Sequence, residues 1–143
     1  VEGGPAYLLY TQNFYRLILS KMNANGVAVI QAGSCSPPAL FNEAFTAIHR
    51  TMSTIFPNQL SAYRASVPSF GGLWGFLMVS LGDDPRGIPS DEIDRRIDQR
   101  ISSELRFYDG ETHAGAFHLP KYLRGAIEAE TRIITEENPV FVF

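Results

Sequence analysis

The side chains that most readily carry catalysis are few in this sequence. Its histidines are His49, His113 and His118, and its only cysteine is Cys35. His113 and His118 lie five residues apart, which is not the spacing that places two ligands on one helical face. A single thiol can form neither an internal disulfide nor a thiolate cage. We therefore predict no metal site and interpret Cys35 as a small packing residue, although a thiolate would be favoured before a helix start.

Carboxylates are grouped at two places. Asp83-Asp84 is a pair that acid–base chemistry could use, but it stands in the loop Gly82–Gly87, whose glycines and proline indicate a turn. The run Asp91–Arg100 mixes both signs of charge, with Asp91–Arg95 and Glu92–Arg96 at supportive helical spacing. We interpret this run as a solvated helix surface.

Gln31, Phe70 and Trp74 are candidates of another kind. Gln31 follows the apolar run 27–30, and open α/β sheets bind ligands at the C-terminal ends of strands. Strand ends also expose polar residues routinely. An indole can stabilise a cation, yet aromatic residues beside an apolar strand usually pack in the core. From the residues alone, both interpretations stay open.

The elements that must position these side chains alternate between helix and strand. The uninterrupted apolar run 27–30 is typical of a parallel strand buried on both faces. A short connection between the last two strands predicts an antiparallel pair. Periodicity and end signals predict a helix from the N-cap Thr11 to Asn25-Gly26 with Tyr10, Phe14, Leu17, Ile18 and Met22 inward, a strand at 27–30, a helix from Pro37-Pro38 to Pro57, and strands at 63–67 and 73–79. This order predicts an α/β fold, namely the tail of a doubly wound sheet that ends in an antiparallel strand pair.

Peripheral elements are predicted after residue 80. They are a helix capped by Ser90 with Ile93, Ile97 and Ile101 on its apolar stripe, a last helix from about Pro120 with Tyr122, Leu123 and Ile127 inward, and a short extended segment at 139–143.

Composition limits the partners. The chain has 143 residues, a length typical of one domain, with 45% hydrophobic and 19% charged residues. A net charge of −3 gives no electrostatic reason to propose nucleic acid. No apolar run is long enough to cross a bilayer, and no signal peptide is visible. We predict a cytoplasmic location, with an organelle as the alternative.

Four stretches, in this order, carry a resemblance to the polyamine aminopropyltransferases. They are Gly4-Pro-Ala6 with Leu9-Tyr-Thr11 and Phe14-Tyr15; Gln31-Ala-Gly33; Val67-Pro-Ser-Phe70 leading into Leu73-Trp-Gly-Phe76; and Arg106-Phe-Tyr108 continuing to His113, Ala116-Phe117 and Leu119-Pro120. The short connection before Trp74 and the stretch Glu2-Gly-Gly-Pro5 look more like thermospermine synthases than spermidine synthases. The resemblance implies a Rossmann-like, methyltransferase-type sheet, of which residues 1–143 would be the C-terminal half of the catalytic domain.

The resemblance also implies a reaction. These enzymes transfer an aminopropyl group from decarboxylated S-adenosylmethionine, a co-substrate, to putrescine or spermidine, and they need no further cofactor. An alkylammonium has a pKa of about 10, so a carboxylate must take the amine's proton before attack. In the family, the carboxylate that does this belongs to an acidic pair just upstream of the triplet that Gly4-Pro-Ala6 matches. The pair would therefore lie before Val1. Glu2 does not match it, so we name no catalytic residue and expect the chain alone to be inactive.

Site roles follow from the same resemblance. Pro5, Ala6 and Leu9 would line the adenine pocket, Gln31 would orient the amine or the carboxylate, and Trp74 would face the polyamine channel. Phe70 stands where the family usually has a tyrosine that binds the acceptor amine.

Two other functions compete with the enzyme. A synthase-like subunit of a homo-oligomer or larger assembly is one, because missing strands would leave a sheet edge that seeks a partner. A methyltransferase is the other, since it shares the sheet architecture.

Overall fold

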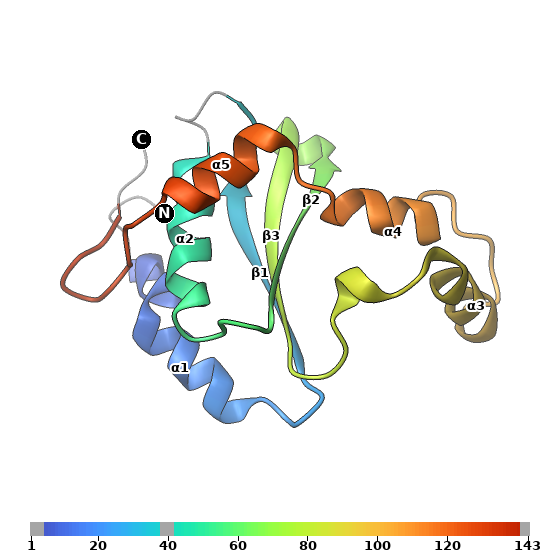
Figure 1. Cartoon of the computed structure of the whole chain (residues 1–143), viewed down its shortest axis with the longest axis horizontal. Helices are drawn as coiled ribbons and strands as arrows, with labels where there is room; N and C mark the ends of the chain where they lie inside the picture. Colours follow the sequence, from blue (N-terminus) through green and yellow to red (C-terminus); the bar gives the residue numbers. More distant parts are fainter. Residues whose placement is uncertain (1–4, 38–41, 141–143) are drawn as a thin grey trace.

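One antiparallel sheet organises the chain. The computed structural model describes residues 5–37 and 42–140, and within them β1 (Val27–Ser34), β2 (Leu60–Val67) and β3 (Gly72–Ser80) form a sheet in the order β1-β3-β2 (Figure 1). β3 is central and antiparallel to both neighbours. The turn between β2 and β3 contains η3 (Pro68–Phe70), which confirms the predicted antiparallel pair with its short connection.

The prediction for the first strand is wrong in two respects. β1 has an antiparallel neighbour rather than a parallel one, with Val27 opposite Ser80 and Val29 opposite Met78. Val27 and Val29 are 59% and 46% exposed, so the strand is not buried on both faces. The physical reason is that β1 is an edge strand here and the helices packed on it contact its other face.

That other face carries the hydrophobic core. α2 (Glu43–Ser53) contacts all three strands as well as α1 (Gln12–Lys21) and α5 (Lys121–Ala129), which Figure 1 shows on the same side of the sheet. Fully buried side chains from these helices and from β3 form one cluster, among them Tyr15, Phe45, Ile48, Met52, Leu77, Val79 and Leu123.

α1 begins as predicted. Thr11 is its N-cap, and the Thr11 hydroxyl accepts a hydrogen bond from the Phe14 N–H at 3.3 Å. The predicted inward face is shifted, however, because Tyr15 is fully buried whereas Leu17 is 53% exposed. α1 ends at Lys21, before the predicted stop.

α2 is shorter than predicted. It begins at Glu43 after the N-cap Asn42 and ends at Ser53, so neither Pro37 nor Pro57 borders it. Pro38 lies outside the described residues.

Two helices lie beyond the edge of β2. α3 (Ser90–Arg100) packs against α4 (Gly110–Phe117), and α4 packs against β2. Ser90 is the first helical residue rather than the cap, and its hydroxyl instead donates to the Gly110 carbonyl at 3.0 Å. Ile101 follows the helix and is 40% exposed. α4 was not predicted.

The C-terminal region follows its prediction in part. α5 begins after Pro120 with Leu123 fully buried, as expected, while the Tyr122 hydroxyl donates to the Cys35 carbonyl at 2.7 Å. Pro139 and Val140 belong to no strand, and residues 141–143 of the predicted extended segment lie outside the described residues. Among the described helices, none has the length and apolar character needed to span a membrane.

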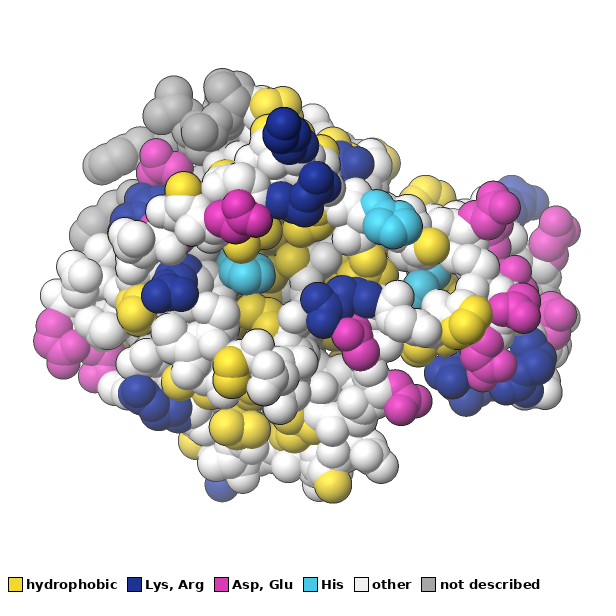
Figure 2. Space-filling model, in the orientation of Figure 1, with side chains coloured by type: hydrophobic (Ala, Val, Ile, Leu, Met, Phe, Trp, Pro, Cys, Tyr) yellow, Lys and Arg dark blue, Asp and Glu magenta, His cyan; other side chains and the backbone are white. Residues whose placement is uncertain are grey.

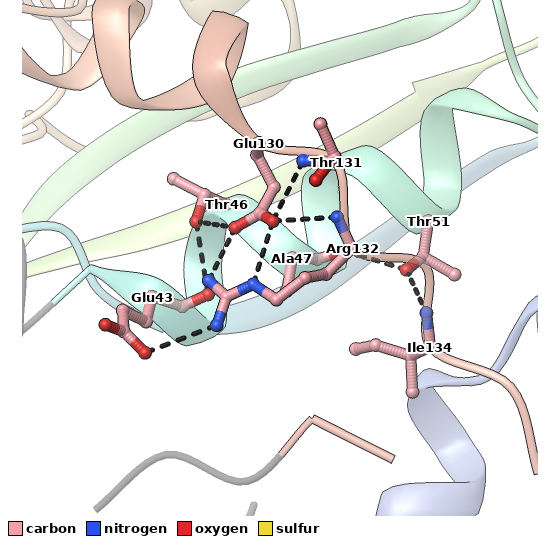
Figure 3. A network of polar contacts seen from close by, with 8 residues as sticks. All are labelled: Glu43, Thr46, Ala47, Thr51, Glu130, Thr131, Arg132 and Ile134. Carbon is pink, nitrogen blue, oxygen red and sulfur yellow. Dashed lines mark hydrogen bonds and ion pairs between the residues drawn. The ribbon is translucent and has the colours of Figure 1, made fainter. Parts of the chain in front are cut away.

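A polar network fastens the segment after α5 onto α2 (Figure 3). The Glu130 carboxylate accepts hydrogen bonds from the Thr46 hydroxyl at 2.8 Å and from the Arg132 guanidinium at 2.6 Å. The Thr51 hydroxyl donates to the Ala47 carbonyl and accepts from the Ile134 N–H at 2.9 Å. These contacts hold the buried Ile134 against the core.

Candidate functional site

A cavity of about 550 Å³ lies between β2 and α4. Strand alternation turns Tyr63 and Ala65 toward the same face of the sheet, and β3 contributes Met78 from that face. Thr112 and Ala116 line the helix side, and the loop before α4 adds Phe107 and Tyr108. Residues from distant parts of the chain thus meet around one hollow.

Aromatic rings form one wall of this cavity. Tyr63 stacks on Phe76 with ring centroids 5.2 Å apart and contacts Phe117 at 5.4 Å. Phe117 in turn lies 5.0 Å from the His113 ring. Aromatic faces attract cations and pack on methylene chains, so a wall of this kind suits a flexible organic cation.

A hydrogen-bonded chain fixes the phenol of Tyr108 at the cavity. One ring nitrogen of the buried His113, Nε2, lies 2.7 Å from the Pro85 carbonyl, and the other, Nδ1, lies 2.7 Å from the Tyr108 hydroxyl. A carbonyl can only accept, so Nε2 carries a proton, which leaves Nδ1 as the acceptor for the Tyr108 hydroxyl. Burial raises the pKa of Tyr108, so its phenol stays protonated. With its hydrogen committed to His113, the phenol oxygen offers only lone pairs to a ligand.

Phe70 and Trp74, two of the predicted site residues, lie together. Their ring centroids are 4.7 Å apart at an interplanar angle of 44°, with Phe70 47% exposed. The Trp74 indole nitrogen is enclosed, yet among the described residues it has no hydrogen-bond partner. A buried donor without a partner is uncommon, and it leaves this N–H available to an acceptor.

Gln31 lies at the point where the regular β1–β3 ladder ends. It pairs with Phe76, and the register then shifts before Ser34. Gly33 sits in this irregular stretch at φ 93°, a conformation that glycine adopts without strain. The Gln31 side chain is exposed. Gln31 pairs with Phe76, and Trp74 lies two residues before Phe76 on β3, so Gln31 and Trp74 share one face of the sheet. The strand itself continues past Gln31 to Ser34, later than predicted.

The predicted adenine-binding residues lie on η1 (Pro5–Tyr10), a short 3-10 helix. Ala6 and Leu9 are exposed, and the side chain of Pro5 lies outside the described part. The Tyr10 hydroxyl is 3.5 Å from the Gln31 carbonyl, which joins the end of η1 to the end of the regular ladder. Gln31 and η1 are therefore brought together, whereas none of the six predicted residues lines the 550 Å³ cavity.

The cavity residues Tyr63 and Tyr108 were not named as site residues from sequence. The signal that could have found Tyr108 is its place in the stretch Arg106-Phe-Tyr108, which precedes His113 by five residues. From the sequence, His113 was considered as a catalytic residue or metal ligand and was part of the same stretch, but it received no site role.

The groups set aside from sequence have structural roles. Cys35 is fully buried, and burial raises the pKa of its thiol. Asp84 caps η4 (Pro85–Gly87) and binds Arg86 at 2.8 Å, as expected of a turn residue. Glu92 pairs with Arg96 at 2.6 Å, as predicted. Arg95 was predicted to pair with Asp91, but it pairs with Glu92 instead.

Comparison with known proteins agrees on one class. The model of the spermine/spermidine synthase domain matches residues 2–85. A polyamine aminopropyltransferase of Sulfolobus acidocaldarius is 44% identical over 140 residues, which cover 98% of this chain and 45% of that protein. Thermospermine synthase ACAULIS5 of Arabidopsis thaliana is 42% identical over 145 residues, which cover 99% of this chain and 41% of that protein.

Solved structures agree on the fold. The spermidine synthase of Thermotoga maritima superposes with a TM-score of 0.68 at 23% identity, over 85% of this chain and 40% of that one. A spermidine synthase in complex with the transition-state analogue AdoDATO gives the same values. The sheet is therefore that of the Rossmann-like, methyltransferase-type fold, as predicted.

The fold and the sequence both match proteins of the polyamine synthase class. The chain belongs to the spermine/spermidine synthase family. It spans less than half the length of the curated relatives that it matches.

Proposed function

We propose that the protein containing this chain transfers an aminopropyl group from decarboxylated S-adenosylmethionine to a polyamine. The observation that carries the proposal is the family match, with 44% identity to a polyamine aminopropyltransferase over nearly the whole chain. The aromatic cavity beside Tyr108 supports it, because its chemistry suits a flexible organic cation.

The reaction sets clear demands on the site. The lone pair of the acceptor amine attacks the aminopropyl carbon bound to the sulfonium sulfur, and a new C–N bond forms. The C–S bond breaks, its electron pair stays on sulfur, and methylthioadenosine leaves. The amine must first lose one proton and must then be held in line with that carbon. The sulfonium is already a good leaving group, so we propose no cofactor beyond the co-substrate.

We assign the polyamine to the side of the sheet that carries Trp74 and the aromatic cavity. Tyr63 and Phe117 would pack on its methylenes, and the Tyr108 oxygen would accept a hydrogen bond from a substrate ammonium. Trp74 and Phe70 would border the channel, with Gln31 on the same sheet face.

We assign the nucleoside of the co-substrate to η1. Its exposed residues Ala6 and Leu9, together with Pro5, would hold the adenine. The contact between Tyr10 and Gln31 supports this assignment, because it joins η1 to the strand end where the reacting groups would meet.

We further propose that these 143 residues alone are inactive. The resemblance of Gly4-Pro-Ala6 to the family's triplet implies that the acidic pair would fall before Val1, so no carboxylate within the chain would match the base that the attacking amine requires. Phe70 lacks the usual tyrosine hydroxyl, so the choice of acceptor should differ from that of relatives with tyrosine there.

Methylthioadenosine release tests the proposal. The protein as its source makes it would be incubated with decarboxylated S-adenosylmethionine and, separately, putrescine, spermidine or spermine, and the 143-residue chain would be assayed beside it. We expect acceptor-dependent release from the source protein and none from the isolated chain. Release with none of the three acceptors would refute the enzyme, and release by the isolated chain would refute its inactivity.

A second function, a non-catalytic subunit of a larger assembly, is favoured by one observation. Val27 and Val29 are exposed on the edge strand β1, and an exposed apolar edge strand favours pairing with another chain. Sedimentation of the isolated chain tests this alternative. Oligomers or partner capture through β1 together with no transferase activity would support it, whereas a folded monomer would contradict it.

A further inference from the structure

A second hollow, of about 370 Å³, lies on the helix-covered side of the sheet. It is bordered by α2, α5, η4 and the end of α4, with Leu60 and Ala62 of β2 in its floor. Figure 2 shows this side, where histidine (cyan) and lysine or arginine (dark blue) side chains surround a hollow with hydrophobic atoms (yellow) inside it. Four basic or imidazole side chains line the hollow: His49, Arg86, His118 and Arg124.

Several hydrogen-bond donors of this lining are uncommitted. Within residues 5–37 and 42–140, neither ring of His49 and His118 makes a hydrogen bond. Arg86 uses Nε and Nη2 on Asp84, which leaves Nη1. Arg124 donates through Nη1 to the Leu119 carbonyl, which leaves Nε and Nη2. No carboxylate is among the described lining residues.

The charge of the hollow sets the kind of ligand. Asp84 neutralises Arg86, but the charge of Arg124 has no acidic partner among the described residues. His49 is neutral near pH 7, because burial and then Arg50 lower its pKa to about 4. The substrates proposed above are cations, and this lining would repel them. An anionic group, in contrast, would find one unneutralised charge and several donors.

The apolar floor adds a second requirement. Leu60, Ala62 and Ile127 line the hollow beneath the basic side chains. A bare inorganic anion would leave this surface uncovered, whereas a ligand with an apolar body would bury it.

We propose that this hollow binds a small anion whose phosphate or carboxylate group contacts Arg124 and the two histidines while its apolar body covers Leu60 and Ala62. The binding itself does not depend on the proposed enzyme activity.

Phe117 connects this hollow with the aromatic cavity, because it lines both. Its ring lines both hollows and contacts Tyr63 and His113 on the cavity side. A ligand that restrains Phe117 from one hollow therefore changes the wall of the other. We expect the bound anion to alter the KM for the polyamine more than kcat.

Proton NMR of the histidine rings tests the site. The probes are phenyl phosphate, inorganic phosphate and uncharged phenol, titrated into the protein as its source makes it, with signals assigned from His49→Gln and His118→Gln. We expect saturable shifts at His49 and His118 with phenyl phosphate, weaker ones with inorganic phosphate, and none with phenol. The His113 ring contacts Phe117 and lies outside this hollow, so we expect a smaller shift there, which reports the coupling through Phe117.

A charge-removing variant provides the control. Arg124→Gln should weaken phenyl phosphate binding about fivefold, the effect of an exposed ion pair. Arg100→Gln, the same change at the exposed end of α3, should leave it unchanged. Equal weakening by both variants, shifts caused equally by phenol, or no saturable shift with phenyl phosphate would each overturn the proposal.

Discussion

Replacement of Glu130 by glutamine should destabilise the protein in a pH-dependent way. The Glu130 side chain is only 6% exposed and its carboxylate accepts hydrogen bonds from Arg132, Thr46 and the N–H of Thr131. Glutamine keeps the size and one acceptor oxygen but removes the charge. The network in Figure 3 would then lose the ion pair between Arg132 and Glu130 and keep the longer pair of Arg132 with Glu43 at 3.3 Å.

The magnitude follows from the pKa. The Arg132 guanidinium, with smaller help from backbone N–H and Thr46 hydrogen bonds, lowers the pKa of Glu130 from 4.5 to about 2. That fall corresponds to about 3 kcal/mol of stability. Because Arg132 is 39% exposed and water screens the pair, we expect about 1–2 kcal/mol. For a domain of this size the melting temperature should fall by about 3–8 °C.

The sign of the pH dependence is fixed by the same values. The folded-state pKa lies below the unfolded one, so the stabilisation is fully present above about pH 4.5 and is lost as the pH falls toward about 2. Thermal melts of the wild type and Glu130→Gln between pH 7 and pH 2.5 measure this difference. Glu128→Gln, an exposed carboxylate in α5, is the matched control and should melt as the wild type does. Equal melting of both variants, or a difference independent of pH, would refute the reasoning.

Three further predictions concern the sheet and the site. Gly75→Ala places a Cβ against the buried ring of Phe45 and should cost about 1–3 kcal/mol in denaturant unfolding, whereas Gly72→Ala, whose Cβ meets the Ser36 hydroxyl at an ordinary contact distance of 3.7 Å, should cost little. Phe70→Tyr restores a hydroxyl at an exposed position and should lower the KM for the acceptor about fivefold, as one hydrogen bond would, without changing the melting temperature; an unchanged KM would contradict its place in the channel. Tyr108→Phe should raise the KM for the acceptor about tenfold with a smaller change in kcat, and steady-state kinetics with an unchanged KM would exclude the phenol oxygen from substrate binding.

Much of the fold follows from local sequence signals. The alternation in 63–67 and the connection Pro68–Gly72 are enough to predict the hairpin of β2 and β3. Thr11 and Pro120 mark the starts of α1 and α5 because capping depends on only a few neighbouring residues.

Other features depend on contacts that local signals do not contain. α4 has glycine at its first residue and again at Gly115, and glycine weakens a helical pattern. The helix is stabilised by the Asp109 cap and by packing of Phe117 on Tyr63. The burial of β1 was predicted from its apolar run, but edge or interior position is decided by the neighbouring strands.

The candidate site shows the same division. The two stretches that contain Gln31 and the pair Phe70 and Trp74 could be found from their resemblance to a family, and the structure brings Phe70 and Trp74 into contact. The roles of Tyr108 and His113 could not be predicted, because the tautomer of His113 is set by the Pro85 carbonyl, 28 residues away.

The most direct test of the proposed function follows the transferred carbon atoms. Decarboxylated S-adenosylmethionine labelled with ¹³C in its aminopropyl group would be incubated with the protein as its source makes it and a polyamine, and the products would be analysed by mass spectrometry. Aminopropyl transfer predicts a polyamine longer by one fully labelled aminopropyl unit, formed in equal amount with methylthioadenosine. Methylthioadenosine without a labelled polyamine, or label found in neither product, would contradict it.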